Sequence, residues 1–264
     1  PPDLDELGRW ILHRSESSLN RCREAYEKYE FHTVFHGLNN YCSVDLSAQY
    51  LDIVKDRLYC AGAKSNERRS AQTTLHRILN VLVHLLAPIL SFTAEEIWTH
   101  MGTKDPPSGS IFLSQMPEAD PAMLDRELAD RWDRIFKERA EVLKALEEAR
   151  TKGIIGHSLD AKIVLVNPNG GPNSSLGQLI KADRTKIQDV LIVSQAEISE
   201  SMTSDSASLS WYKTELLNCQ IGVTKAEGLK CERCWKYDTE VGKDASHPTV
   251  CARCAAVLTP GAAA

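Results

Sequence analysis

No stretch of this 264-residue sequence approaches the roughly 20 consecutive apolar residues that a membrane-spanning helix needs. The most apolar segment, Ile78 to Phe92, is interrupted by three residues: Asn80, His84 and Pro88. We therefore expect no membrane partner. The N-terminus has neither a signal peptide nor an initiator methionine, so we expect Pro1 to lie inside a longer polypeptide. The absence of internal repeats argues against a repeat architecture.

The sequence also lacks a strong excess of one charge, with 31 Lys and Arg against 36 Asp and Glu and a net charge of −5. A globally basic nucleic-acid-binding protein is thereby excluded, but a polyanion needs only a local basic face. The hydrophobic fraction of 42% and the charged fraction of 25% are typical of a globular protein. The length is enough for one large domain or two small ones.

Four of the eight cysteines stand alone, at irregular spacing: Cys22, Cys42, Cys60 and Cys219. In a chain of this size, that pattern is typical of a reducing compartment, and we expect a cytoplasmic location. We expect each lone cysteine to be a small buried hydrophobic residue.

Residues 3 to 150 read as helix almost throughout, because apolar residues recur at helical spacing from Leu4 to Tyr29 and beyond. We expect a second helix from Phe31 to about Cys42, an interruption at residues 43–45, and a resumed helix from Ser47 to Leu58. Asn66 would cap the next helix, which runs toward Pro88.

Two further helices are predicted in the same region. Thr93 and Glu96 have capping-box spacing, and Pro121 opens a long charged helix that Gly153 and Gly156 end. The Gly/Pro/Ser-rich segment 102–109 between them is predicted to be a loop.

After Gly153 the composition shifts toward strands. Lys162–Val166, Val190–Val193 and Gln220–Thr224 are predicted strands, and Leu176–Lys181 is a predicted short helix. Residues 167–175 and 199–210 read as loops. We predict a mainly α protein: a helical-bundle domain (1–152), a small α/β junction (153–225), a zinc-binding tail (226–258) and a disordered end (259–264).

The remaining four cysteines form two C-x-x-C pairs, Cys231/Cys234 and Cys251/Cys254, separated by residues 235–250. Each pair turns two sulfurs toward one point, and a 16-residue spacer fits a short hairpin between the turns. Two such pairs supply the four corners of a tetrahedron, which is the geometry that Zn²⁺ accepts. We predict one structural Zn²⁺ that folds this tail, here named the zinc knuckle (residues 226–258).

The alternatives for this motif are two disulfides, a redox C-x-x-C, an iron–sulfur cluster, or His247 replacing one cysteine as a ligand. A reducing compartment disfavours the disulfides, and no thioredoxin-like context supports the redox motif. Four cysteines leave no open coordination position, so we expect a structural site.

Trp235, Lys236 and Tyr237 follow the first pair. Aromatic residues beside basic ones can stack on unpaired bases. The alternative is that Trp235 covers the zinc turn as a miniature core. The residues leave both interpretations open for Trp235 and slightly favour the structural one for Tyr237.

A basic island stands out within an acidic region. Residues 1–150 hold 19 Lys and Arg against 24 Asp and Glu, yet the window 55–77 has a local charge of +4 (six basic residues, two acidic). Its basic residues are Lys55, Arg57, Lys64, Arg68, Arg69 and Arg77. Guanidinium groups bind phosphate through paired hydrogen bonds, and a helix start at residues 66–69 would point N–H groups at an anion. The alternative is a solvated helix face.

Several segments strongly resemble the anticodon-binding helical domain and the C-terminal end of the bacterial isoleucyl-tRNA synthetase family. They are FHGLNNY (35–41), YLDIVKDRLY (50–59), RRSAQT (68–73), APILSFTAEEIW (87–98) and KAEGLKC (225–231) running into Cys234–Trp235 and the second cysteine pair. The zinc-binding end separates this family from its valine and leucine relatives.

The resemblance implies the tRNA-recognition part of a class I aminoacyl-tRNA synthetase, which joins isoleucine to tRNA(Ile) using ATP. The HIGH-type and KMSKS-type signatures of that family do not occur here. We therefore assign no catalytic residue to this chain, and ATP and Mg²⁺ would bind only to an upstream catalytic domain of the same polypeptide. The fragment alone is predicted to be inactive, and a monomer.

The implied task is recognition of the anticodon stem-loop, with phosphate contacts that position the RNA and base contacts that specify it. The candidate RNA-binding residues are Lys55, Arg57, Arg68, Arg69, Arg233, Trp235 and Lys236. A free-standing zinc-dependent RNA-binding module is the alternative, and a valine- or methionine-type relative is a third possibility. The C-terminal position of the cysteines argues against a methionine-type enzyme, in which such pairs lie inside the catalytic domain.

Overall fold

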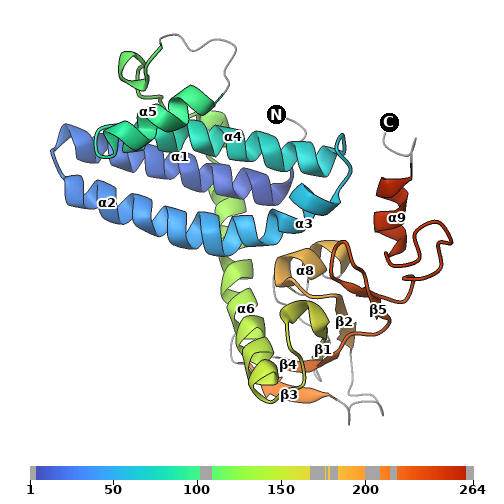
Figure 1. Ribbon diagram of the computed structural model, residues 1–264. Coiled ribbons are helices and arrows are strands. Elements are labelled where there is room, and N and C mark those ends of the chain that lie inside the picture. Colours follow the sequence, from blue (N-terminus) through green and yellow to red (C-terminus); the bar gives the residue numbers. More distant parts are fainter. Residues whose placement is uncertain are drawn as a thin grey trace. The chain divides into compact units, whose positions relative to one another are not determined.

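The computed structural model describes residues 4–101, 109–166, 176, 178, 184–199, 209–214 and 219–259. The chain divides into two compact units: Pro1–Asp52 with Asn66–Ala129, and Ile53–Ser65 with Asp130–Ala264. Figure 1 gives the order of the elements, and each unit is described by itself. The predicted mainly α architecture with a small sheet and a cysteine cluster near the C-terminus is confirmed.

The first unit is a helical bundle of α1 (Glu6–Glu27), α2 (Phe31–Asn40), α4 (Asn66–Leu86) and α5 (Ser91–His100). Helix α1 contacts both α2 and α4, and the three run side by side in Figure 1. Asp5 caps α1 by accepting a hydrogen bond from the Gly8 amide at 3.0 Å. The core between these helices includes Leu19, Cys22 and Leu85, so the periodic apolar residues found in the sequence do form the bundle interior.

The predicted interruption at residues 43–45 is wrong. The chain continues from α2 as a π-helix, η1 (Tyr41–Leu51), and then as α3 (Asp52–Cys60). The i→i+5 bonds of a π-helix widen each turn, so Tyr41, Asp45 and Tyr50, spaced four and five apart, share one buried face. Asp45 accepts two hydrogen bonds from Arg14, at 3.2 and 3.3 Å. Of the three residues that suggested an interruption, Asp45 is thus buried with a partner, while Ser43 and Val44 lie on the exposed side of the continuing helix.

Three predicted helix starts also differ from the structure. Helix α5 begins at Ser91 after Leu90, which makes no side-chain cap, so Thr93 is not a capping-box residue. Pro121 lies in a short 3₁₀ turn, η3 (Pro121–Met123), and the long helix α6 spans Arg126–Thr151. Asn66 is the first residue of α4 and not its cap. Local capping patterns predict that a helix is present more reliably than they predict the residue at which it begins.

A second 3₁₀ turn, η2 (Ile111–Leu113), contacts α5. The end of α6 is as expected, because Gly153 follows with φ of +72°, a conformation that suits glycine after a helix.

The second unit holds a four-stranded sheet in the order β2-β1-β4-β3. Its strands are β1 (Ala161–Val166), β2 (Gln195–Ser199), β3 (Ser210–Lys213) and β4 (Gln220–Lys225). Strands β1 and β2 are parallel, whereas β4 pairs antiparallel with both β1 and β3. A 3₁₀ turn, η4 (Ser158–Asp160), precedes β1. Two of the three predicted strands, β1 and β4, are confirmed.

The predicted strand Val190–Val193 is wrong, because α8 (Arg184–Leu191) occupies its first half and β2 begins only at Gln195. Ile187, Val190 and Leu191 are all buried, at helical spacing of three and four residues. Periodicity alone cannot decide whether a short apolar run forms a strand or a buried helix, and here Val190 and Leu191 belong to a helix.

The zinc knuckle contains a two-stranded ribbon, β5 (Leu229–Lys230) with β6 (Tyr237–Asp238), and the helix α9 (Ala252–Leu258). Gly228 has φ of +91°, and a Cβ there would lie 2.4 Å from the backbone of Asp238. Only glycine fits where the chain enters the knuckle.

Several predictions lie wholly or mostly outside the described residues: the loops at 102–109, 167–175 and 199–210, the helix at 176–181 and the end from 260. Of the lone cysteines, Cys22, Cys60 and Cys219 are buried as expected, and Cys42 is half-buried. Within the described part of the chain, no helix is both long enough and apolar enough to cross a membrane.

Candidate functional site: a four-cysteine metal centre

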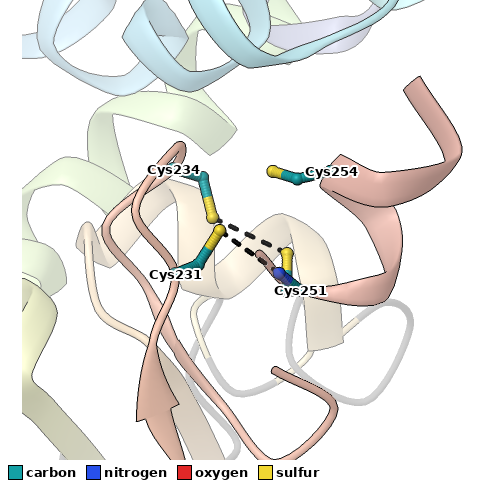
Figure 2. A group of neighbouring side chains, drawn as sticks. All are labelled: Cys231, Cys234, Cys251 and Cys254. Atoms are coloured by element: carbon teal, nitrogen blue, oxygen red, sulfur yellow. Dashed lines mark hydrogen bonds between the residues drawn. The ribbon is translucent and has the colours of Figure 1, made fainter. Parts of the chain in front are cut away.

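The two cysteine pairs, distant in sequence, converge in the zinc knuckle. The sulfurs of Cys231, Cys234, Cys251 and Cys254 all lie within 4.8 Å of one another, and Figure 2 shows them directed toward one space. The Cys234 and Cys251 sulfurs are 3.8 Å apart. Zinc–sulfur bonds of about 2.3 Å at tetrahedral angles place neighbouring sulfurs about 3.8 Å apart. The spacing therefore fits one tetrahedral Zn²⁺.

The local backbone explains how each pair reaches this geometry. The Trp235 amide donates to the Cys231 carbonyl at 2.9 Å, and the Cys231 amide donates to the Lys236 carbonyl at 2.9 Å. These bonds close a tight turn in which Trp235 takes a left-handed φ of +65°. In the second pair, Cys251 precedes the first residue of α9 and Cys254 lies on its first turn.

All four cysteines are buried, and Cys234, with 9% of its surface exposed, is the most accessible. Val241, Val250 and Ala255 belong to the same buried cluster. His247 is not part of the four-sulfur group found among the described residues, so cysteine is favoured at every corner. A closed, buried set of four sulfurs defines one structural zinc site with no open position for catalysis.

Neighbouring N–H groups donate hydrogen bonds to the sulfurs and so stabilise the thiolate form, which is the form that binds a metal ion. The Cys251 amide donates to the Cys231 sulfur at 3.3 Å, and the Arg233 guanidinium to the Cys254 sulfur at 3.7 Å. The hydrogen bond from Cys254 lowers the pKa of the Cys234 thiol to about 4, while the same bond and burial raise the pKa of Cys254. Zinc binds cysteine as the thiolate, so metal binding displaces protons from ligands that are still thiols.

The zinc knuckle is also tied to the sheet region of its unit. Lys236 forms an ion pair of 2.6 Å with Asp189 of α8, and both side chains are less than 20% exposed. The Tyr237 amide donates to the Ser194 hydroxyl at 2.7 Å, and that hydroxyl donates to the Leu159 carbonyl. These contacts attach ribbon β5–β6 to α8 and to the residues that precede strands β1 and β2.

Trp235 is 61% exposed. A side chain that covered the zinc turn as a miniature core would be buried, so the exposure favours a surface role for this indole. Tyr237 is half-buried.

The other predicted RNA-binding residues fall in both units. Lys55 and Arg57 lie on α3 in the same unit as the zinc knuckle, where Lys55 is exposed and Arg57 half-buried. Arg68 and Arg69 lie in the other unit, on the first turn of α4, where Arg69 is exposed. The basic island is thus divided between the units.

The residues that sequence reasoning missed are Asp56, Cys60 and Arg253. Arg253 forms a two-point ion pair with Asp56, at 2.5 and 2.8 Å, across 197 positions of sequence. A signal was present, because both cysteine pairs read C-x-R-C, with an arginine before the second ligand. The partner on α3 had no such signal.

The fold and the site together define the class of protein: a mainly helical protein with a structural zinc site. The chain belongs to the family described as the anticodon-binding domain of tRNA ligase, whose model matches residues 8–165, more than half of its length. A second model, the zinc finger found in FPG and IleRS, matches residues 228–257.

Curated relatives match almost the whole chain. It is 43% identical to the isoleucine–tRNA ligase of Syntrophotalea carbinolica over 256 residues, which cover 97% of this chain and 26% of that protein. It is equally identical to the isoleucine–tRNA ligases of Desulfitobacterium hafniense and Moorella thermoacetica, of which it covers 27%. The chain thus spans about a quarter of the length of these relatives. The resemblance seen in the sequence is confirmed, and a free-standing module is not favoured.

Proposed function

We propose that this chain is the tRNA-recognition part of an isoleucine–tRNA ligase, an enzyme that attaches isoleucine to tRNA(Ile) using ATP. The observation that carries the proposal is 43% identity to such ligases across 97% of the chain, through both the helical unit and the zinc knuckle. The chemistry, with its ATP and Mg²⁺, belongs to an upstream catalytic domain of the same polypeptide. A cytoplasmic monomer is part of the same proposal.

We propose the domains that the sequence indicates: residues 1–152 as the anticodon-binding helical domain, 153–225 as the junction and 226–258 as the zinc-binding tail. The two compact units divide the chain differently, because residues 53–65 and 130–152 belong to the second unit. The four cysteine sulfurs Cys231, Cys234, Cys251 and Cys254 are the proposed zinc ligands.

Positioning of the RNA is assigned to Lys55, Arg57, Arg68 and Arg69, whose cationic groups suit phosphate. Arg69 is the strongest candidate for a phosphate contact, because it is exposed on the first turn of α4. Helix N-termini add backbone N–H donors and a partial positive charge to such a contact.

Recognition of an unpaired anticodon-loop base is assigned to Trp235. Its indole is largely exposed beside a turn that two backbone hydrogen bonds close and that the proposed zinc ligands Cys231 and Cys234 flank. An exposed aromatic face on a rigid support is what base stacking requires. At this turn, zinc would thus act on the RNA indirectly, through the backbone that it fixes.

Arg233 and Lys236 enter the proposal differently from the sequence interpretation. Lys236 is paired with Asp189, and Arg233 with main-chain carbonyls and a cysteine sulfur. Contacts of this kind support a role in holding the turn that presents Trp235, with any phosphate contact made by the remaining donors of Arg233.

Binding to anticodon stem-loops tests the proposal. The zinc-loaded chain is titrated with the labelled stem-loops of tRNA(Ile) and tRNA(Val), and with a scrambled loop on the same stem. We expect the tRNA(Ile) stem-loop to bind tightest, and all three to weaken with salt because phosphate contacts release counterions. Equal affinity for the three would contradict anticodon recognition by this chain.

A further inference from the structure

Two arginines of the zinc knuckle each contact both the cysteine site and α3. The Arg233 guanidinium donates to the Cys254 sulfur at 3.7 Å and to the Cys60 carbonyl at 2.5 Å. Arg253 holds Asp56 through two hydrogen bonds and directly precedes the proposed ligand Cys254 in the chain. Both contacts lie within one compact unit.

The charge of the metal centre explains why arginines stand there. Four thiolates around one Zn²⁺ carry a net charge of about −2, and a buried net charge is costly unless opposite charges lie beside it. Arg233 supplies a positive charge at the Cys254 sulfur, and Arg253, beside the same cysteine in the chain, supplies a second that it shares with the carboxylate of Asp56. Arginine can also direct its several N–H donors at two acceptors at once, which a lysine cannot do with the same geometry.

On α3, the contacts converge on one face near the C-terminal end of the helix. Asp56 and Cys60 are four residues apart and so lie on the same side. Cys60 is buried in the cluster that holds the four cysteines, Val241 and Val250, and its thiol donates to the Arg233 carbonyl at 3.5 Å. Arg233 reaches the Tyr59 and Cys60 carbonyls, which a helix end leaves without intrahelical partners. A cation at this end also suits the helix dipole.

The pKa of Asp56 agrees with a lasting ion pair. Burial of its carboxyl group opposes ionisation, but the hydrogen bonds from Arg253 and the nearby charge of Lys236 outweigh it and lower the pKa below its ordinary value. Asp56 is therefore ionised at neutral pH when the zinc knuckle is folded.

We propose that Arg233 and Arg253 couple the zinc centre to α3, so that metal binding orders the C-terminal turn of this helix and sets the direction of Lys55 and Arg57. Neighbouring helical residues are turned by about 100° from one another. Docking through Asp56 therefore leaves Lys55 and Arg57 on the two flanks of the contact. Loss of zinc would then disturb phosphate-binding residues that are distant from the cysteines in sequence; only this last step rests on the proposed function.

Hydrogen exchange without RNA tests the coupling itself. The whole 264-residue chain is compared with Zn²⁺ bound and after removal by a chelator. We expect exchange at residues 57–60 to accelerate at least tenfold on zinc removal, while amides of strand β1 stay unchanged. Equal protection of α3 in both states would overturn the proposal.

Three variants test the two sides of the ion pair between α3 and the zinc knuckle, Asp56 on α3 and Arg253 beside the cysteines. Asp56→Asn should retain one equivalent of zinc and yet exchange faster at residues 57–60, because it loses the Arg253 contact with α3 and keeps only the Arg233 contacts with Tyr59 and Cys60. Arg253→Gln should do the same and also weaken zinc affinity by roughly 10- to 100-fold, as loss of a group that supports a metal ligand does. Glu240→Gln is the control, because Glu240 pairs with Lys243 inside the zinc knuckle. Wild-type protection in Asp56→Asn would refute coupling through Arg253.

Binding of the tRNA(Ile) stem-loop tests the consequence for RNA. Asp56→Asn removes a negative charge, which by simple electrostatics should strengthen RNA binding. We expect it to weaken binding about threefold or more, because Lys55 and Arg57 lose their orientation. If wild-type chain binds no stem-loop, the proposed function fails while the exchange result stands. If Asp56→Asn binds as well as wild type or better, the link from zinc to the RNA contacts is overturned.

Discussion

Replacement of Trp235 separates its two possible roles. With 61% of its surface exposed, the indole keeps about 39% in contact with the protein. For a side chain of roughly 250 Å², that is on the order of 100 Å², or at most about 2.5 kcal/mol at ~25 cal/mol per Å². The zinc knuckle is held by metal binding of order 10 kcal/mol, so a Trp235 variant should keep its zinc.

Stacking of one base on an aromatic side chain contributes about 1–3 kcal/mol, which is roughly a 5- to 150-fold change in affinity. Trp235→Leu keeps apolar bulk and the same left-handed backbone but has no π face, whereas Trp235→Phe keeps a smaller ring. We expect Trp235→Leu to lose stem-loop binding within that range and Trp235→Phe to recover much of it.

The assay pairs fluorescence anisotropy of a labelled tRNA(Ile) stem-loop with zinc analysis of the same samples. A Trp235→Leu variant that holds one zinc and binds RNA like wild type would refute the stacking assignment. A variant that loses its zinc would show instead that the indole serves the structure of the knuckle.

Three further changes test other parts of the molecule. Cys251→Ser should lose stoichiometric zinc and the exchange protection of α9, measured by metal analysis and mass spectrometry; one retained equivalent would mean that the ligands are wrong. Arg69→Ala should weaken tRNA binding and reduce the slope of log affinity against log salt by about one, and an unchanged slope would remove Arg69 from the phosphate contacts. Burial raises the pKa of Glu16 despite its hydrogen bond from the Asp120 amide, so its contribution to stability is present in acid and lost as pH rises through the folded-state pKa. Glu16→Gln should therefore raise the melting temperature at pH 7 and lose this advantage near pH 4; a lower melting temperature at pH 7 would contradict the burial argument.

The short-range features were the predictable ones. The helical periodicity of α1 and α4 reached the bundle core, and strands β1 and β4 followed from their β-branched residues. The wrong element types were the π-helix at Tyr41–Leu51 and the helix α8, besides the three misplaced helix starts. In each, a local reading of polar or apolar residues was overruled by burial against partners distant in sequence.

By itself, the sequence determined the metal, because C-x-x-C spacing alone brings two sulfurs to one point and two copies complete a tetrahedron. It also carried the family, through motifs spread over nearly its whole length. Only the tertiary structure decided what surrounds the sulfurs. The pairing of Arg253 with Asp56 spans 197 positions, and no local pattern encodes it. Whether Trp235 is a core or a surface residue depended likewise on what folds over it, and folding leaves it exposed.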